Sequence, residues 1–423
     1  MEKVILTQNK HWKSSYSNLY SREILTTLIS YLVTKQIQVL QGIRRSGKST
    51  LFKLIINHLR NTVDPKEILY VNLDDPFFIP YAHEPTKLYE IVQTAEKITQ
   101  TKVKYLFFDE VQAIEGWEHF IKSVYDSEEF SKIFITGSNS TLLNGKLATL
   151  LSGRYLSSRV TPLSFNELLH IEGVENYMAL LENLPKVLHL VDSMMKYGSF
   201  VEVYTLQEDL KRSLISTYYD TIILKDCVAT HGIRDFKSFK ELSFYLISNP
   251  CTLYSYSSLG KVIGMHDKSA KEYVTYLEES YLIQEIKMFS YSLKEQQNNK
   301  KKAYFIDNGF FALNFNFSSN FGTLLENLVF TELAKLGCEL YYYKADFECD
   351  FVIKSPDGFE GIQVCYELND QNRKREFGGL QKLAKQFDLK KQTIITYNQE
   401  EVSSDINVVP FWKYFYLSNK GGN

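Results

Sequence analysis

The sequence GIRRSGKST occupies residues 42–50 and is the most informative stretch of the chain. It matches the pattern G-x-x-x-x-G-K-[S/T], in which glycines let backbone N–H groups surround phosphate groups at the start of a helix. The run QIQVLQ at 36–41 is typical of a β-strand, and residues 50–59 have apolar side chains at helical spacing. A strand, a glycine-rich loop and a helix in this order predict a phosphate-binding loop rather than a chance match.

Each residue type in this loop has a chemical task. Lys48 is expected to reach the β- and γ-phosphates of ATP, and the Ser49 hydroxyl is expected to bind Mg²⁺. GTP is disfavoured because no N-K-x-D motif follows the loop. ATP and Mg²⁺ are therefore the predicted cofactors. The other residues expected to line the phosphates are Gly42, Ile43, Arg44, Arg45, Ser46, Gly47 and Thr50.

A second signal is the apolar run at 103–108, which ends in Asp109 and Glu110. A buried parallel strand would deliver both carboxylates to the edge of the sheet where the phosphates lie. Asp109 is then expected to hold Mg²⁺, and Glu110 is expected to orient and deprotonate the attacking water. A solvated acidic strand end is the alternative, but pairing with the loop favours the catalytic interpretation.

Further candidates follow the apolar strand predicted at 132–136. Ser138 and Asn139 could hydrogen-bond the γ-phosphate or its water, although small polar residues at a strand end are also common turn formers. Arg154 is a candidate for stabilising transition-state charge, in cis or across a subunit contact, with Arg159 just downstream. Most arginines are only solvated or ion-paired, so this role stays open.

Chain length, composition and net charge limit the classes of function that remain. A chain of 423 residues predicts about three modules, and 44% hydrophobic with 23% charged residues is typical of a globular protein. The net charge of −2 provides no global attraction for nucleic acid, so any DNA contact must be local. Five cysteines lack the spacing of a zinc site, and no apolar run is long enough to span a membrane. We expect a cytoplasmic protein without a membrane partner.

Helical and strand patterns divide the chain into four predicted domains. Residues 1–164 form the nucleotide-binding domain, and 165–234 form a helical lid or linker. Three helix patterns followed by two strands with a polar tip at 294–301 outline a winged helix over 235–308. Residues 309–423 form a second α/β module.

Several motifs together resemble the archaeal-type AAA+ ATPase family: GIRRSGKSTL, LFFDEVQ with Trp117, ITGSNS and SGRYLSSRVTPLSFNELL. The rest of the chain is similar to the domain of unknown function that accompanies this ATPase, through KAYFIDNGF, ENLVFTEL, ECDFVI and GIQVCYEL. The resemblance implies an α/β P-loop NTPase fold of ASCE/AAA+ type with a parallel sheet, a helical lid and a winged helix. It also implies slow ATP hydrolysis and a C-terminal restriction-endonuclease-like module of PD-(D/E)xK type.

The nuclease-like pattern is incomplete. Glu326, Asp350 and Gln363 match the positions of acidic and amide residues that hold a metal, but Cys365 replaces the lysine that helps to activate water. This departure favours a degenerate module, and we expect it to cut no DNA.

The basic residues of the predicted winged helix do not decide whether the protein binds DNA. The lysines of the predicted winged helix that could meet DNA phosphates are Lys268, Lys271, Lys300, Lys301 and Lys302. Glu272, Glu278 and Glu279 share the same helix, and such modules also serve as packing units. ATP is the expected partner, while DNA, a protein partner and a second copy of the chain stay open.

Two functional hypotheses remain. The first is an ATP-driven conformational switch that controls how the winged helix and the C-terminal module are presented, and the second is an ATP-regulated DNA-binding or DNA-cleaving enzyme. A helicase, suggested by the DEVQ run at 109–112, is disfavoured because no second motor core follows.

Overall fold

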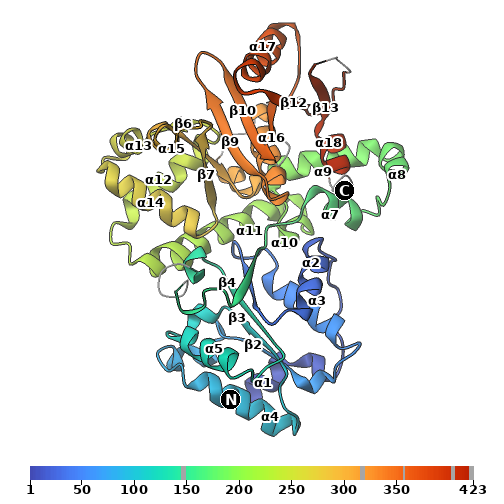
Figure 1. The fold of residues 1–423 in the computed structure, drawn as a ribbon, viewed down its shortest axis with the longest axis vertical. Helices are drawn as coiled ribbons and strands as arrows, with labels where there is room; N and C mark the ends of the chain where they lie inside the picture. Colours follow the sequence, from blue (N-terminus) through green and yellow to red (C-terminus); the bar gives the residue numbers. More distant parts are fainter. Residues whose placement is uncertain (144–148, 315–319, 356–357, 402–404, 419–423) are drawn as a thin grey trace. The chain divides into compact units, whose positions relative to one another are not determined.

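A computed structural model describes residues 1–143, 149–314, 320–355, 358–401 and 405–418. The chain forms two compact units, drawn in Figure 1. The N-terminal unit comprises Met1–Thr161 with Glu279–Tyr281, and the C-terminal unit comprises Pro162–Glu278 and Leu282–Asn423. None of the helices in the described ranges is both long and apolar enough to cross a bilayer.

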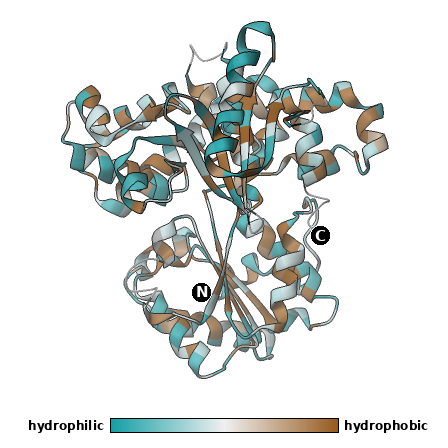
Figure 2. Ribbon diagram, turned by 45° about the horizontal axis from the view of Figure 1, so that its top comes forward, coloured by the Kyte–Doolittle hydropathy of each residue, from teal (hydrophilic) through white to brown (hydrophobic). Residues whose placement is uncertain are grey.

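The N-terminal unit contains a five-stranded sheet in the order β2-β3-β4-β1-β5, with every neighbouring pair parallel. Its strands are β1 (Ile37–Gln41), β2 (Ile68–Asn72), β3 (Tyr105–Asp109), β4 (Lys132–Gly137) and β5 (Tyr155–Arg159). The first four are nearly continuous apolar runs because both faces of the sheet are buried, and Figure 2 shows the hydrophobic character of these strands. The edge strand β5 is partly exposed and polar, and the sequence did not predict it.

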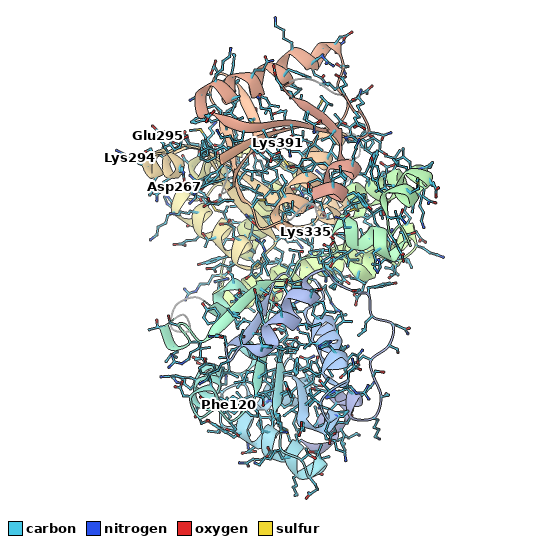
Figure 3. The ribbon with its side chains drawn as sticks, turned by 45° about the vertical axis from the view of Figure 1, so that its right-hand side comes forward. Phe120, Asp267, Lys294, Glu295, Lys335 and Lys391 are labelled. Carbon is cyan, nitrogen blue, oxygen red and sulfur yellow. The ribbon has the colours of Figure 1, made fainter. Side chains whose placement is uncertain are left out.

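Helices cover both faces of this sheet (Figure 1). Alternate residues of β3 point to opposite faces, so Phe108 packs near Phe120 of α5 (Trp117–Asp126), which Figure 3 labels. Phe107 instead packs against Phe52 of α3 (Lys48–Leu59) and stacks on Phe134. The other covering helices are α1 (Glu2–Gln8) and α4 (Lys87–Thr99) on the α5 face and α2 (Ile24–Ser30) on the α3 face. The predicted α/β architecture of this part is confirmed.

The C-terminal unit begins with helices. Ser164 caps α7 through a reciprocal pair of hydrogen bonds with Glu167, as its sequence pattern favours. The helices are α7 (Phe165–Ile171), α8 (Tyr177–Glu182), α9 (Leu184–Tyr197), α10 (Val201–Tyr204) and α11 (Glu208–Thr221), which continues as a π-helix over Ile222–Ala229.

Three more helices precede a hairpin, in the order predicted for 235–308. They are α12 (Phe236–Ser248), α13 (Tyr256–Ile263) and α14 (Asp267–Glu279), and the hairpin strands are β7 (Ile283–Met288) and β8 (Lys301–Phe305). The polar tip between these strands contains a helix, α15 (Leu293–Asn298), that the sequence did not predict. Ser292 accepts a hydrogen bond from the Glu295 N–H at its start, and Lys294 and Glu295 are exposed (Figure 3).

The hairpin belongs to an eight-stranded sheet in the order β13-β12-β11-β10-β9-β7-β8-β6. Strand β7 pairs in parallel with β9 at Lys287↔Tyr341 and Met288↔Tyr342, so the hairpin and the C-terminal strands share one sheet across the boundary predicted at 308. The other strands are β6 (Leu253–Tyr254), β9 (Glu339–Lys344), β10 (Glu348–Ser355), β11 (Gly358–Cys365), β12 (Leu389–Thr396) and β13 (Asn407–Pro410). The accompanying helices are α16 (Phe321–Lys335), α17 (Asp370–Phe387) and α18 (Phe411–Ser418).

Candidate functional site

The glycine-rich loop joins β1 to α3 at the carboxyl edge of the parallel sheet. Gly42 has a φ of +150°, and a Cβ added there would lie 2.0 Å from the carbonyl oxygen of Val160. Gly47, with a φ of +99°, is the residue before the first turn of α3. Both positions therefore need glycine, which explains the spacing of the motif in terms of backbone geometry.

Lys48 places its ammonium inside this loop. The side chain is buried, and Nζ donates hydrogen bonds to the carbonyl oxygens of Gly42 at 2.8 Å and Ile43 at 3.1 Å. The Ser46 hydroxyl is also buried, and it has no hydrogen-bond partner within the described part of the chain. A buried ammonium, an unsatisfied hydroxyl and the N-terminus of a twelve-residue helix fit the oxygens of a phosphate group.

Asp109 ends β3 at the same edge and is almost fully buried. Its Oδ1 accepts a hydrogen bond from Thr136 Oγ1 at 2.5 Å, and its Oδ2 accepts one from the Tyr70 hydroxyl at 2.8 Å. Burial and the neighbouring Glu110 charge raise the pKa of Asp109, while a hydrogen bond from the Ser49 hydroxyl lowers it. Ser49 and Asp109 thus present adjacent oxygen ligands of the kind that Mg²⁺ prefers.

Glu110 follows in a left-handed backbone conformation with a φ of +55°, and its N–H donates to Thr136 Oγ1 at 2.8 Å. Burial alone would raise the pKa of Glu110, but the positive charges of Lys48 and Arg44 outweigh this effect and hold that pKa below its ordinary value. The carboxylate is therefore ionised at neutral pH and able to accept a proton.

A polar network surrounds this carboxylate. Gln112 Nε2 donates to Glu110 Oε2 at 2.5 Å and lies 3.4 Å from Ser138 Oγ. Arg44 Nη2 lies 3.5 Å from the same hydroxyl, so Ser138 joins the loop to the acidic strand end. Asn139 is buried directly after Ser138, and its carbonyl oxygen accepts the Leu142 N–H at 3.2 Å.

The structure places Arg154 elsewhere. Its carbonyl oxygen accepts the Ile37 N–H, just before β5 and β1 begin, and its Nε pairs with Asp126 at 3.0 Å. In a parallel sheet the strands begin at the edge opposite the phosphates, so the predicted role of Arg154 in cis is wrong, and a role in trans stays a prediction. Arg159 ends β5 opposite Gln41 and so lies at the carboxyl edge.

Sequence reasoning did not identify four residues that support the site. Tyr70 and Thr136 hold Asp109, Gln112 holds Glu110, and the buried Arg22 guanidinium donates to the Ser46 carbonyl oxygen at 3.0 Å and to that of Thr161 at 2.8 Å. Tyr70 and Thr136 are polar residues within otherwise apolar strands, which is the signal that could have found them.

Two of the wing lysines are not available to DNA. Lys301 is buried, and its ammonium donates to the carbonyl oxygens of Gln297 and Asn299 at 2.6 and 2.7 Å, while Lys302 is buried among carboxylates. The prediction that these two meet phosphates is therefore wrong. Lys268 and Lys271 are exposed on α14, and their contact with DNA stays a prediction.

Comparisons with known proteins agree with this geometry. Residues 34–169 match the model of an AAA domain, which confirms the predicted P-loop AAA+ fold with a parallel sheet. Residues 188–320 and 321–414 match two domains of unknown function, DUF8612 and DUF4143.

Whole-chain relatives are also found. The chain is 34% identical to the uncharacterized protein MJ1544 of Methanocaldococcus jannaschii over 90% of this chain and 89% of that protein. It is 30% identical to an uncharacterized protein of Haemophilus influenzae, over 85% of this chain and 90% of that protein. The Aeropyrum pernix ORC1 protein, solved in complex with DNA, is 11% identical with a TM-score of 0.34, and the match covers 78% of this chain and 98% of that one.

Proposed function

We propose that this chain, which belongs to the family of the uncharacterized protein MJ1544 and carries an AAA domain, is a Mg²⁺-dependent ATPase. One observation carries the proposal: Lys48 and Ser49 at the start of α3 meet Asp109 and Glu110 at the end of β3, at one edge of the sheet. An ammonium for the phosphates, two oxygen ligands for a cation and an ionised carboxylate for a proton are the parts that ATP hydrolysis needs.

Each of these residues has a distinct task in the proposed reaction. Lys48 and the loop N–H groups bind and orient the phosphates, and Ser49 with Asp109 would hold Mg²⁺, which supplies charge neutralisation when it is bound. Glu110 accepts the proton of the attacking water. Arg44 lowers the pKa of Glu110 and reaches toward Ser138, so it is an arginine of the same chain placed to respond to charge on the terminal phosphate.

We infer further that ATP acts on this protein as a switch. The hydrogen bonds that join Glu110, Gln112, Ser138 and Arg44 link the loop after β1 to the ends of β3 and β4, so a phosphate that displaces one member would reposition the others. The second unit carries domains of unknown function, and we propose that nucleotide state controls how this unit is presented to a partner.

The test is ATP turnover by the full-length chain, measured as phosphate release with and without double- and single-stranded DNA. Glu110→Gln keeps the shape of the side chain but cannot accept a proton, so turnover should fall by about 100-fold or more while ATP stays bound. Glu115→Gln is the matched control, because this exposed glutamate lies 2.7 Å from His83 Nδ1 and outside the polar network around Glu110, so turnover should stay unchanged. Absence of turnover under all conditions would refute the ATPase, and wild-type turnover in Glu110→Gln would refute the assigned base.

A further inference from the structure

Lys302, on β8 of the C-terminal unit, ends in a group of three carboxylates. Its Nζ lies 3.2 Å from Glu326 Oε1 on α16, 3.1 Å from Glu348 Oε1 and 3.6 Å from Asp350 Oδ1, both on β10. The lysine side chain is only 3% exposed. A lysine so deeply buried is expected only where its charge is paired, and here three acidic side chains converge on one ammonium.

Neighbouring groups fix these carboxylates. The Tyr304 hydroxyl, two residues along β8 and so on the same face as Lys302, donates to Glu326 Oε1 at 2.6 Å. The Val364 N–H donates to Asp350 Oδ2 at 2.9 Å, and the Lys344 ammonium lies 2.8 Å from Glu348 Oε2. The group is therefore a fixed arrangement built from one helix, α16, and four strands, β8 to β11, rather than a loose surface cluster.

The resemblance to PD-(D/E)xK nucleases implies a divalent cation on Glu326 and Asp350, and the residues present do not fit one. The Lys302 ammonium already contacts both carboxylates, and a second cation between them would lie beside it in a buried site, where like charges repel strongly. Among the residues that the structure describes, no group of three or more acidic, histidine or cysteine side chains is arranged to hold a metal.

Cys365 does not take the place of the missing lysine. Its thiol accepts a hydrogen bond from Asn372 Nδ2 at 3.4 Å, and burial raises the pKa of Cys365 to about 11. It is therefore a neutral thiol at physiological pH and supplies no charge to the neighbouring carboxylates.

We propose that Lys302 is the resident cation of this site, in place of a divalent metal ion, and that the C-terminal unit consequently does not hydrolyse phosphodiesters by a metal-dependent route. A metal ion could reach these carboxylates, because Glu326, Glu348 and Asp350 line an open cavity of about 940 Å³. The metal ion is excluded by repulsion from the Lys302 ammonium.

Charge balance supports the proposal. The ammonium groups of Lys302 and Lys344 face the carboxyl groups of Glu326, Glu348 and Asp350, so lysines of the same chain already balance most of the negative charge in this group. The acidic neighbours in turn raise the pKa of Lys302 against the effect of its burial, so the ammonium stays charged.

The test counts bound Mn²⁺ by electron paramagnetic resonance in the full-length chain without nucleotide, in an Asp109→Asn background that removes the ATPase metal ligand. The chain with Lys302 and the charge-preserving Lys302→Arg variant should bind no Mn²⁺ that depends on Asp350. Lys302→Met should gain a single Mn²⁺ site, with an affinity at least about tenfold higher than any Mn²⁺ binding by the Lys302 chain. Asp350→Asn added to Lys302→Met should remove that site.

Mn²⁺ binding by the Lys302 protein that Asp350→Asn abolishes would overturn the proposal, and so would a folded Lys302→Met chain without a gained site. A second measurement stands even where Lys302→Met fails to fold. Wild-type protein incubated with plasmid, linear duplex and single-stranded DNA, with Mg²⁺ or Mn²⁺ and with or without ATP, should leave all three intact. Cleavage that is lost in Asp350→Ala but kept in Lys48→Ala would show an active metal centre and refute the resident ammonium.

Discussion

Lys48 is the residue whose loss should affect nucleotide binding most. Its buried ammonium makes hydrogen bonds of 2.8 and 3.1 Å within the loop, so it is held where phosphate oxygens would bind. Charge-assisted hydrogen bonds contribute roughly 1.5–3 kcal/mol each, so Lys48→Ala should weaken Mg-ATP binding by at least about tenfold in calorimetry. Lys53→Ala on the same helix is the control, since that ammonium lies over the Tyr16 ring and away from the loop. Unchanged affinity in a folded Lys48→Ala protein would remove the site assignment.

His11 makes the stability of the N-terminal unit depend on pH. The ring is fully buried, its Nε2 lies 3.0 Å from the Ile68 carbonyl oxygen, and burial lowers the pKa of His11 from 6.5 to about 4. Between these two pH values the unfolded chain binds a proton on His11 that the folded chain does not. The free energy of unfolding is therefore highest above about pH 6.5, and it falls as the pH is lowered toward 4. The expected loss from this residue between pH 7 and pH 5 is about 2 kcal/mol.

Trp12 provides the measurement for this prediction, because its indole N–H donates to the same carbonyl oxygen at 2.9 Å. Urea unfolding followed by Trp12 fluorescence, with Trp117 and Trp412 replaced by Phe, should show the pH-dependent loss. His11→Gln should flatten the pH dependence, while the exposed His58→Gln should leave it as in the parent. An equal pH dependence in all three proteins would contradict the assignment to His11.

The residues that could be predicted are those whose tasks are encoded in contiguous sequence. The loop at 42–50 and the pair Asp109–Glu110 carry their own signature, since spacing along the chain fixes their geometry. Tyr70 and Thr136 reach Asp109 only through strand neighbours, and Lys302 reaches Asp350 only through the C-terminal sheet. Contacts of this kind depend on tertiary packing, so a single sequence does not show them.

At the scale of elements, the turn between β1 and α3 depends on Gly42. A Cβ there would meet the backbone carbonyl of Val160 at 2.0 Å, and backbone cannot move aside as a flexible side chain can. Gly42→Ala should therefore destabilise the N-terminal unit by several kcal/mol and abolish nucleotide binding, as judged by thermal unfolding and calorimetry. Gly153→Ala is the control: its φ is +73° but no atom lies within 4 Å of the added Cβ, so only about 1–2 kcal/mol of backbone strain is expected. Similar stabilities for the two variants would contradict this account.

Burial explains which elements the sequence predicted. Strands β1 to β4 read as apolar runs because helices cover both their faces, and the positions predicted for β1, β3 and β4 agree with the structure within a few residues. Strand β5 carries polar, partly exposed residues at the sheet edge, so it lacks that signal. Helix α15 lies in a polar segment whose composition resembles a loop, and its cap at Ser292 was too local a feature to distinguish the two.

At the scale of the whole molecule, sequence patterns indicated four modules and the structure has two compact units. Part of the difference arises at one short parallel pairing, β7 with β9, which joins the predicted winged-helix hairpin to the C-terminal strands. A parallel pairing between segments some 50 residues apart has no local sequence signature, unlike a hairpin turn. The buried Lys302 contributes to the same junction, because this lysine of the hairpin forms ion pairs with carboxylates on α16 and β10.

The position of Arg154 makes contact between two copies of the chain testable. Arg154 lies at the sheet edge opposite the phosphates of its own chain, with its Nε 3.0 Å from Asp126 and a third of its side chain exposed. It could therefore complete an active site only in a second copy of the chain, and turnover per subunit should then rise with protein concentration. Arg154→Ala should lower turnover without weakening ATP binding much, and the exposed Arg234→Ala should not.

Mixing two variants with lowered turnover gives the sharper form of this test. A Glu110→Gln chain lacks the base but offers Arg154, while an Arg154→Ala chain keeps the base and lacks the arginine. If Arg154 acts in trans, the mixture should show higher turnover than the average of the two variants measured alone, because some active sites then combine an intact base with an intact arginine. A concentration-independent rate that Arg154→Ala does not change would remove this role. Arg44, which already lies 3.5 Å from Ser138 within the same chain, would then be the arginine to test as the stabiliser of transition-state charge.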